Sequence, residues 1–218
     1  MIIYIPIKEN SQRVPQKNFR EFKGKPLWEH TIDKLKDYIV VVDTDSTQII
    51  QACKNKDWVM AWKRPKKLRG DLVSVVDLLK NYFNKHKTKE IIVQLHVTSP
   101  FFDVNHLEEV QKQIRLYNYD SVFSVDKVQN RFWRKEEYGL VPINHNPMKL
   151  EQTQDLPPYY MENSYFYFFT IDVLKLGNRI GKNPIAVPIS FPYNLDIDTE
   201  DDWDMVKSIN NTFIFKNE

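Results

Sequence analysis

The stretch MIIYIPIKENSQRVPQKNF (residues 1–19) decides how this chain is organised. It opens with an apolar run from Ile2 to Ile7, which predicts a buried strand, and passes directly into a polar loop. Ligands of open α/β sheets bind at the carboxyl ends of the strands. A site for a polyanion is therefore predicted directly after the first strand, where the chain carries four cations, Lys8, Arg13, Lys17 and Arg20.

The rest of the chain alternates strand and helix patterns. Residues 39–42, 91–93, 121–125 and 165–169 are apolar, β-branched or aromatic runs without polar alternation, which suits strands covered on both faces. Residues 73–83, 107–117 and the stretch after Thr199 repeat apolar side chains every three or four positions, which predicts helices. We therefore expect an α/β fold with a doubly wound, mostly parallel sheet and right-handed crossovers.

Residues 127–160 break this alternation. They contain four prolines and several aromatic residues and show no helical periodicity. An irregular excursion of this length inside a compact domain is usually functional or part of an interface. We expect one domain over residues 1–218, with residues 127–160 inserted as a dimerisation or lid segment.

Length and composition favour a single globular domain. The 218 residues carry a formal net charge of +2, too small to indicate a nucleic-acid or membrane partner. The single cysteine, Cys53, rules out an intramolecular disulfide and is expected to be a core residue on a helix. No apolar run approaches the roughly 20 residues that a membrane span needs, and the first residues do not resemble a signal peptide. We expect a cytoplasmic protein.

Paired carboxylates near the end of the chain predict a metal site. In Leu195-Asp196-Ile197-Asp198-Thr199, the two aspartates are two residues apart and point to one face if the segment is extended. Mg²⁺ prefers oxygen ligands, commonly one or two carboxylates completed by substrate phosphates. The alternative, acids favoured by a helix dipole, explains residues 200–202 better than Asp196 and Asp198.

The first loop favours phosphate binding but lacks one common feature of phosphate loops. Lys8 and Lys17 are compact charges suited to phosphate, and amide or hydroxyl groups come from Asn10, Ser11 and Asn18. A loop whose backbone approaches phosphates usually contains glycine, yet the first glycine here is Gly24. A solvated charged loop therefore stays open as the alternative.

Two more segments follow predicted strands and are expected beside the first loop. They are residues 43–46 (DTDS) and residues 96–100 (HVTSP). His96 could contact a nucleotide base, or it could be a buried, hydrogen-bonded histidine. Its residue type and position leave both possibilities open.

These segments resemble the acylneuraminate cytidylyltransferases, the CMP-sialic acid synthetases and their relatives that act on Kdo and other acidic nonulosonic sugars. IPIKENSQRVPQKN and GKPLWEHTI resemble the family's phosphate loop and the helix after it, and VVDTDSTQI its second strand and turn. RPKKLRGDLVSVVDLL, LHVTSPF and YDSVFSV follow in order. QTQDLPPYYMENSYFYF is similar to the stretch before the family's NGxxY strand, and LDIDTEDDW to its metal-binding IDIDTxxD. The resemblance covers nearly the whole chain.

The resemblance implies a Rossmann-like nucleotidyltransferase that joins CTP to an acidic 2-keto sugar, with Mg²⁺, and releases pyrophosphate. It implies catalytic roles for Lys8, Lys17 and Asp198, and metal binding by Asp196 and Asp198. It implies nucleotide binding by Lys8, Lys17, Asn18, Arg64 and Ser99. Asn10, Ser11, Arg13 and His96 complete the set of nucleotide-binding candidates because of their positions in the first loop and after a predicted strand. Family members are dimers in which a protruding segment reaches over the neighbour's site, so a homodimer is expected.

The sequence departs from the family pattern at several positions, and the loss of one cation near the acceptor half of the site leaves the identity of the acceptor more open than that of the nucleotide. Lys8 stands where arginine is common, His96 where glutamine is, Ser164 where glycine is, and Glu9, Asn10 and Gln12 replace glycines. Thr153 stands where the family often has arginine. The candidates for binding the acceptor carboxylate are Arg131, Arg134 and Lys149, and exposed surface charge is an equal alternative for them.

Two other functions are consistent with the sequence. One is cytidylyl transfer to a different acidic acceptor, such as Kdo or a phosphonate. The other is a nucleotide-binding protein that has lost catalysis, as the glycine-free loop suggests. Retention of both lysines and both aspartates argues against the second.

Overall fold

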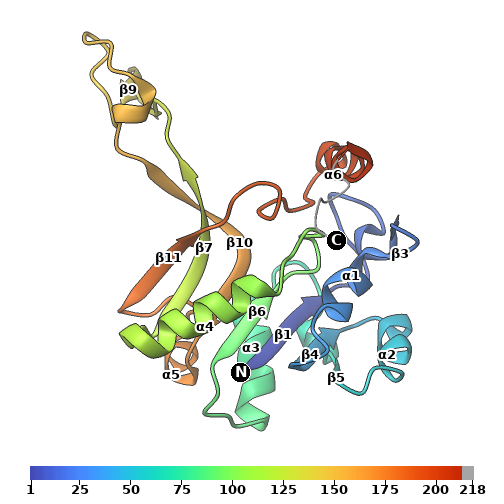
Figure 1. Cartoon of the computed structure of the whole chain (residues 1–218). Helices are drawn as coiled ribbons and strands as arrows, with labels where there is room; N and C mark the ends of the chain where they lie inside the picture. Colours follow the sequence, from blue (N-terminus) through green and yellow to red (C-terminus); the bar gives the residue numbers. More distant parts are fainter. Residues whose placement is uncertain (213–218) are drawn as a thin grey trace.

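The computed structural model describes residues 1–212, and only the backbone of residues 210–212. A mixed sheet of seven strands forms its centre (Figure 1), in the order β11-β7-β10-β6-β1-β4-β5. The strands are β1 (Ile2–Ile7), β4 (Ile39–Thr44), β5 (Val59–Lys63), β6 (Ile92–Leu95), β7 (Ser121–Val128), β10 (Tyr159–Phe169) and β11 (Pro184–Pro188). β10 runs antiparallel to β6 and β7, and every other neighbouring pair is parallel.

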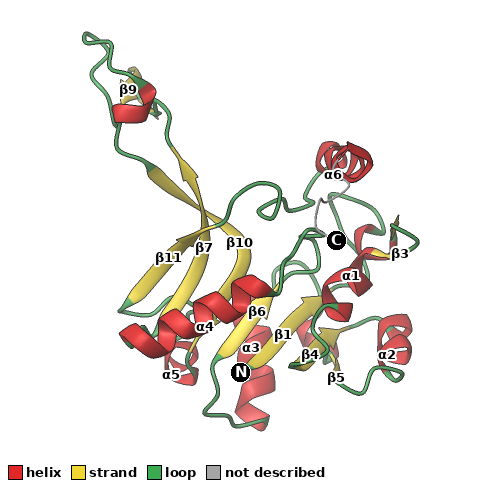
Figure 2. Ribbon diagram, viewed as in Figure 1, coloured by secondary structure: helices red, strands yellow, loops and turns green. Residues whose placement is uncertain are grey.

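Helices cover both faces of this sheet (Figure 2). One face carries α1 (Leu27–Asp33), α2 (Thr47–Cys53) and α4 (Asn105–Tyr117), and the other carries α3 (Val75–Lys85) and α5 (Ile171–Lys175). Shorter elements are β2 (Glu21–Phe22), β3 (Lys25–Pro26) and the 3₁₀ turns η1 (Lys17–Phe19), η2 (Lys66–Leu68) and η3 (Thr153–Asp155). The last element, α6 (Glu200–Thr212), packs beside the first loop.

The alternation of side chains along the strands produces two cores. Ile3 and Ile5 of β1 lie in the core under α1, α2 and α4, whereas Tyr4 between them lies in the core under α3 and α5. Cys53 is in the first core and is 2% exposed, so the expectation of a buried helical cysteine is confirmed. The doubly wound, mostly parallel sheet is confirmed as well.

One connection differs from the expected right-handed crossovers. The chain moves from β1 to β4 to β5 through α1 and α2, and from β6 in the opposite direction to the parallel β7 through α4. α4 nevertheless packs on the same face as α1 and α2. A connection on the same face in the opposite direction has the opposite hand, so the expectation of uniform handedness was wrong. Insertion of β10 between β6 and β7 accompanies this exception.

The order of the strands creates a switch point beside β1. From β1 the chain first builds outward through β4 and β5 and then returns to place β6 on the other side of β1. The loops that follow β1 and β6 therefore leave the same sheet edge in different directions and open a crevice between them. The cationic loop after β1 and His96 after β6 both lie there.

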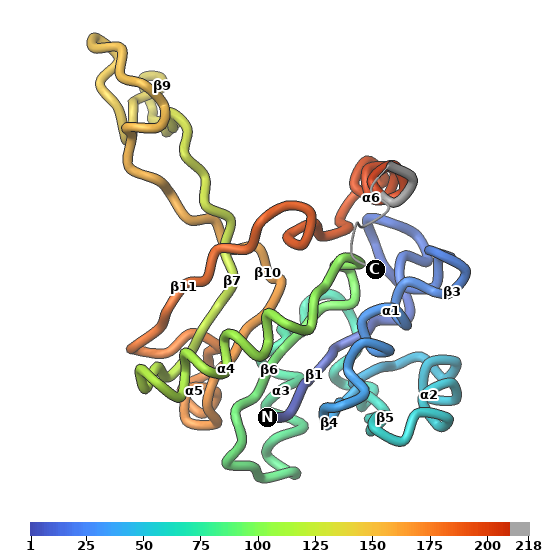
Figure 3. Tube along the Cα trace, in the orientation of Figure 1, coloured from blue at the N-terminus to red at the C-terminus, as the bar shows by residue number. Residues whose placement is uncertain are grey.

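Residues between β7 and β10 form a long arm that projects away from the sheet (Figure 3). The paired ends of β7 and β10 make its base, with Tyr159 opposite Val128. Its outer part holds a small hairpin of β8 (Trp133–Glu136) and β9 (Gly139–Pro142). The irregular segment predicted at residues 127–160 corresponds to this arm, and its role as an inserted unit stays a prediction.

α6 begins as the sequence predicts. The backbone N–H of Asp202 donates to Thr199 Oγ1 at 3.2 Å, and the N–H of Thr199 donates back to the Asp202 carboxylate at 2.7 Å. This reciprocal pair is a capping box. Trp203, Val206 and Ile209 then pack on one face. Within residues 1–212, no helix combines the length and the apolar character that crossing a lipid bilayer requires.

Candidate functional site

The loop after β1 forms one wall of a cleft of about 300 Å³ at the switch point. The opposite walls come from the residue after β6, His96, and from the segment between Arg64 and Val75. Eight of the nine predicted nucleotide-binding residues line it: Lys8, Asn10, Ser11, Arg13, Lys17, Asn18, Arg64 and His96. The ninth, Ser99, is 2% exposed and is not among the lining residues, whereas its neighbour Thr98 is.

The two ends of the chain meet at this cleft. The Lys17 ammonium donates to the carbonyl oxygen of Ile197 and lies 3.4 Å from Asp198 Oδ1. Arg13 approaches the same carboxylate oxygen at 2.8 Å. The Lys17 side chain is 12% exposed and that of Arg13 is 68% exposed, so Lys17 is the more firmly enclosed cation. These contacts bring the first loop and the aspartate segment, which lie at opposite ends of the sequence, to one place.

A second set of contacts fixes this junction. Arg20 binds the Glu200 carboxylate with both terminal nitrogens, at 2.6 and 2.7 Å, and its guanidinium lies 5.4 Å from the centre of the Trp203 ring. Ile197 is fully buried and its N–H donates to the Thr98 carbonyl oxygen at 3.0 Å. These contacts hold the aspartate segment between the first loop and the residues after β6.

Asp196 has an unpaired oxygen at this junction. Its Oδ1 is buried and has no hydrogen-bond partner among the described residues. Because buried polar atoms are nearly always paired, this oxygen fits a cation ligand. Within residues 1–212, no three His, Cys, Asp or Glu side chains are grouped to hold a metal ion by themselves. A metal here would therefore need further oxygens from a bound substrate or from water.

The Lys8 side chain is paired with Asp71 at the other side of the cleft. Its ammonium lies 3.1 Å from Asp71 Oδ1, and the Gln12 amide donates to the second oxygen of Asp71 at 2.5 Å. The Asn18 side chain donates to the Lys8 backbone carbonyl at 2.9 Å and shapes the turn of the loop. Asp71 is an exposed residue, and its carboxylate lies where an anionic ligand of Lys8 would bind.

Arg64 is held by a buried ion pair beneath the cleft. Its Nε donates to Asp43 Oδ1 at 2.7 Å, and the other Asp43 oxygen accepts from the Tyr4 hydroxyl. The three residues are at most 1% exposed. Burial raises the pKa of Tyr4, and the Asp43 carboxylate beside it adds to the rise. Arg64 is thus a fixed cation in the floor of the cleft, and its side chain is not free to move into the cleft.

His96 is a neutral hydrogen-bonded histidine at the wall of the cleft. Arg179 Nη1 donates to Gln94 Oε1 at 2.7 Å, so the Gln94 amide nitrogen faces His96 and donates to its Nε2 at 2.7 Å. A ring nitrogen that accepts carries no proton. Burial lowers the pKa of His96, against the pull of Asp196, and the nearby cations of Arg179 and Lys17 lower it further.

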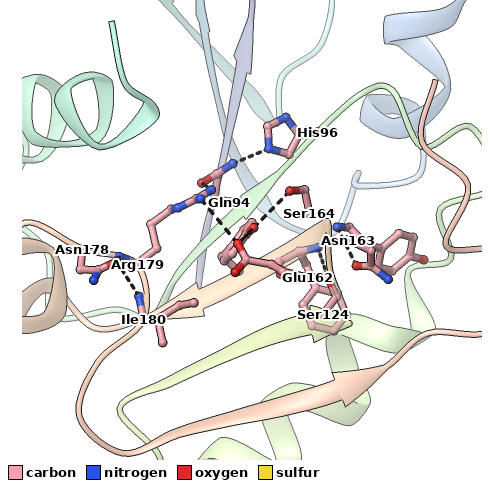
Figure 4. Close-up of polar contacts among 12 residues, drawn as sticks. Gln94, His96, Ser124, Glu162, Asn163, Ser164, Asn178, Arg179 and Ile180 are labelled. Carbon is pink, nitrogen blue, oxygen red and sulfur yellow. Dashed lines mark hydrogen bonds and ion pairs between the residues drawn. The ribbon is translucent and has the colours of Figure 1, made fainter. Parts of the chain in front are cut away.

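A second polar cluster extends from His96 toward β10 (Figure 4). Arg179 lies over the Tyr167 ring, with its central carbon 3.7 Å from the ring centre. The Tyr167 hydroxyl donates to Glu162 and lies 3.1 Å from the Ser164 hydroxyl. Ser164 has a left-handed backbone, with φ of 59°, at a bulge in β10. Glycine adopts this conformation without strain, so the serine here costs backbone energy beside the site.

The three predicted acceptor-binding cations lie on the arm. Arg131 donates to the Glu151 carbonyl oxygen, Arg134 pairs with Glu136, and Lys149 lies 3.5 Å from Glu151. Figure 1 shows the arm projecting away from the sheet, and no residue of the arm is among the described residues that line the cleft of its own chain. Their role therefore stays a prediction that depends on a second copy of the chain.

Three residues at the site were not predicted from the sequence: Asp71, Gln94 and Arg179. Gln94 had a usable signal, because Gln94 and His96 are polar residues two apart in an otherwise apolar strand and so share a face. Asp71 and Arg179 lie in loops, and nothing in their local sequence indicates which strand they reach.

A sequence model described as "Cytidylyltransferase" matches residues 2–217. The chain belongs to this cytidylyltransferase family. The resemblance seen in the sequence is therefore confirmed, and it covers the cleft, the aspartate pair and the arm alike.

Relatives within the family are distant. An N-acylneuraminate cytidylyltransferase A from Danio rerio is 29% identical over 206 residues, which is 88% of this chain and 46% of the relative. A CMP-N,N'-diacetyllegionaminic acid synthase from Legionella pneumophila is 27% identical. The match covers 96% of this chain and 95% of that relative. This chain thus spans about half of the N-acylneuraminate enzymes that it matches and nearly all of the legionaminic acid enzyme.

A solved structure shares the fold. A CMP:2-keto-3-deoxy-manno-octonic acid synthetase complexed with CTP superposes with a TM-score of 0.68 at 16% identity, over 97% of this chain and 98% of that one. At this identity the likeness establishes a Rossmann-like nucleotidyltransferase fold.

Proposed function

We propose that this protein transfers CMP from CTP to an acidic 2-keto sugar, a nonulosonic acid such as a sialic acid, and releases pyrophosphate. The observation that carries the proposal is the convergence of Lys8 and Lys17 with Asp196 and Asp198 at one cleft, in a chain of the cytidylyltransferase family. Cations suit the triphosphate, and the paired carboxylates suit a metal that accompanies it.

The activities for which relatives are named support this acceptor class. They include N-acylneuraminate and legionaminic acid enzymes, and a pseudaminic acid cytidylyltransferase from Campylobacter jejuni that is 25% identical and covered over 93% of its length. Each of these names an acidic sugar. The chain matches the last two over nearly their whole length.

In the proposed reaction the anomeric hydroxyl of the sugar attacks the α-phosphorus of CTP. A new oxygen–phosphorus bond forms in line with the bond to the departing pyrophosphate, and the hydroxyl proton is released. Such transfers depend mainly on positioning and charge neutralisation. Lys8 and Lys17 would stabilise the pyrophosphate, and the fixed Arg64 and neutral His96 would orient the nucleotide.

We further propose that Mg²⁺ is the cofactor. The unpaired buried oxygen of Asp196 fits a cation, and the Asp198 carboxylate lies two residues away on the same segment. When bound there, Mg²⁺ would neutralise phosphate charge and lower the pKa of the attacking hydroxyl. Lys17 and Arg13 would then exchange the Asp198 carboxylate for phosphate oxygens, because both are cations already gathered at that position.

A homodimer joined through the arm is part of the proposal. The arm exposes large apolar side chains that a lone protomer leaves in water, among them Tyr138 (95% exposed), Leu140 (64%), Met148 (92%) and Leu150 (92%). Exposed apolar clusters of this kind mark protein interfaces. We also propose a cytoplasmic location, where CTP and a reduced Cys53 are expected.

The test is pyrophosphate release by the purified chain with Mg²⁺. Each of CTP, UTP, ATP and GTP is offered with N-acetylneuraminic acid, a legionaminic acid, Kdo and a phosphonate acid. The proposal expects release with CTP and a nonulosonic acid. Release with Kdo or the phosphonate alone would assign the alternative acceptor, and no release with any pair would overturn the proposed activity.

A further inference from the structure

Arg179 lies in the loop between α5 and β11, in the second polar cluster described above. Its side chain is only 21% exposed, whereas the two residues that precede it in this loop, Gly177 and Asn178, are exposed. An arginine that turns inward from an exposed loop loses hydration of its charge. The contacts that it makes therefore indicate what the charge is for.

The guanidinium is held in position by two contacts. It stacks 3.7 Å from the centre of the Tyr167 ring and donates from Nη1 to Gln94 Oε1 at 2.7 Å. Gln94 is fully buried, and on the sheet it pairs with Tyr4 on β1 and with Tyr167 on β10. Both partners of Arg179 thus belong to rigid central strands, so its orientation is set by the sheet and not by the loop.

These contacts leave most of the guanidinium's hydrogen-bonding capacity unused. Arginine carries five N–H donors, and within residues 1–212 the Arg179 side chain makes one hydrogen bond. The nearest carboxylate, that of Glu162, lies at 4.0 Å, beyond hydrogen-bond distance, and accepts the Tyr167 hydroxyl instead. The Glu162 side chain is 43% exposed. It is therefore a loose counterion that a better-placed carboxylate can replace.

The cluster is continuous with the cleft. Gln94 joins Arg179 to His96 (Figure 4). His96 in turn lines the cleft together with Lys8 and Lys17. Arg179 is therefore connected to the wall of the cleft through a single side chain, that of Gln94. A ligand extending from the cleft past His96 would approach its guanidinium.

We propose that Arg179 binds the carboxylate of the acidic acceptor. The Tyr167 ring stacks against the guanidinium, and Gln94 fixes the orientation of the guanidinium. This inference rests on the proposed cytidylyl transfer and names the residue that makes it selective for acids. A planar guanidinium matches a carboxylate with two parallel hydrogen bonds. Glu162 is displaced from the guanidinium when the acceptor enters and keeps its bond from Tyr167.

Arg179 is better placed for this role than the cations predicted from the sequence. Arg131, Arg134 and Lys149 lie on the arm, and each contacts a group of the arm itself. Thr153, where an arginine is common in the family, supplies no charge. Arg179 provides a cation from within the same chain.

The test compares an acid with its uncharged analogue. N-acetylneuraminic acid and Kdo, each with its C1 amide, are assayed with CTP against wild type, Arg179→Gln, Arg179→Lys and the control Lys182→Gln. Lys182 is an exposed cation of the same loop. We expect Arg179→Gln to raise KM for the acid by about 10- to 100-fold, as loss of hydrogen bonds to a charged group implies. The KM for CTP and the KM for the amide stay within a factor of two.

Arg179→Lys keeps the charge without the fork, so it should lie between wild type and Arg179→Gln. If Arg179→Gln does not fold, as judged by circular dichroism, the lysine variant alone decides. It must still lower the ratio of kcat/KM for the acid to kcat/KM for the amide. An unchanged ratio in a folded variant that turns over would overturn the inference.

Binding separates this inference from the proposed function. Calorimetry with each acid and a non-hydrolysable CTP analogue is run on the same proteins. If wild type binds the acid, Arg179→Gln does not, and no pyrophosphate is released, the inference stands and the proposed reaction falls. If neither acid binds wild type, the inference falls as well.

Discussion

The ammonium group of Lys17 lies 3.4 Å from a carboxylate oxygen of Asp198, although 181 positions separate the two residues. The strand order brings the loop after β1 to the switch point, and α6, docked through Arg20 and Glu200, brings the aspartates to the same place. In the absence of a ligand the cations and the carboxylates neutralise one another. This arrangement is suited to exchange those partners for phosphate and metal.

Replacing Asp198 by asparagine tests the carboxylate with little change in shape. We expect turnover to fall on the order of 10²- to 10³-fold, as loss of a key charge contact typically does. The melting temperature should change little, because the ion pairs of Asp198 with Lys17 and Arg13 are partly solvated and contribute about 1 kcal/mol or less. Asp201→Asn, an exposed acid three residues away, is the control. Wild-type pyrophosphate release by Asp198→Asn would refute the assigned role.

Asp71 should compete with the triphosphate for Lys8. Asp71→Asn removes the charge that lies 3.1 Å from the Lys8 ammonium, so the cation becomes free to bind a phosphate. Because an exposed pair contributes roughly 0.2–1 kcal/mol, CTP affinity measured by calorimetry should rise by about 1.5- to 5-fold. A clear loss of affinity would instead make Asp71 part of the binding site.

The buried pair of Asp43 and Arg64 should dominate the stability of the cleft floor. Arg64→Met leaves the Asp43 carboxylate buried and unpaired, which costs about 3–5 kcal/mol. The measurement is the free energy of unfolding in urea, with Lys66→Met, an exposed cation two residues on, as the control. A loss below about 1 kcal/mol would show that water reaches Asp43.

The arm should control assembly. Tyr138→Asp combined with Leu140→Asp places charge on two exposed apolar positions and should convert a dimer to a monomer in sedimentation equilibrium. Leu116→Asp, at a 74% exposed apolar position on α4, is the matched control and should stay dimeric. A monomeric wild type, or a variant that stays dimeric, would contradict an interface through the arm.

Much of the fold follows from local patterns, and what does not follow lies at the sheet edges and in β10. The run from Ile2 to Ile7 is a strand because no polar residue interrupts it. β11 is bounded by Pro184 and Pro188, which argue against a strand by themselves, and it is tolerated because it is an edge. The antiparallel course of β10 depends on the arm that precedes it, and no local pattern encodes that direction.

The candidate site divides in the same way. The position of Lys17 was predictable because the loop after a first parallel strand lies at the carboxyl edge of the sheet. Asp198 was predicted as a metal ligand from its spacing to Asp196, but its place beside Lys17 depends on the tertiary contact of Arg20 with Glu200. Arg179 was not predicted, because its position depends on tertiary contacts with Gln94 and Tyr167 from two neighbouring strands. Arg64 was predicted as a nucleotide contact, and its pairing with Asp43 became evident only from the register of β4.

The most direct measurement follows a radioactive label on the α-phosphorus of CTP. The wild-type protein is incubated with Mg²⁺ and each acid of the panel, and the products are separated. We predict that the label moves into a CMP-sugar in amounts equal to the pyrophosphate released. Label that stays in CTP with every acid, or that appears only as free CMP, would contradict cytidylyl transfer.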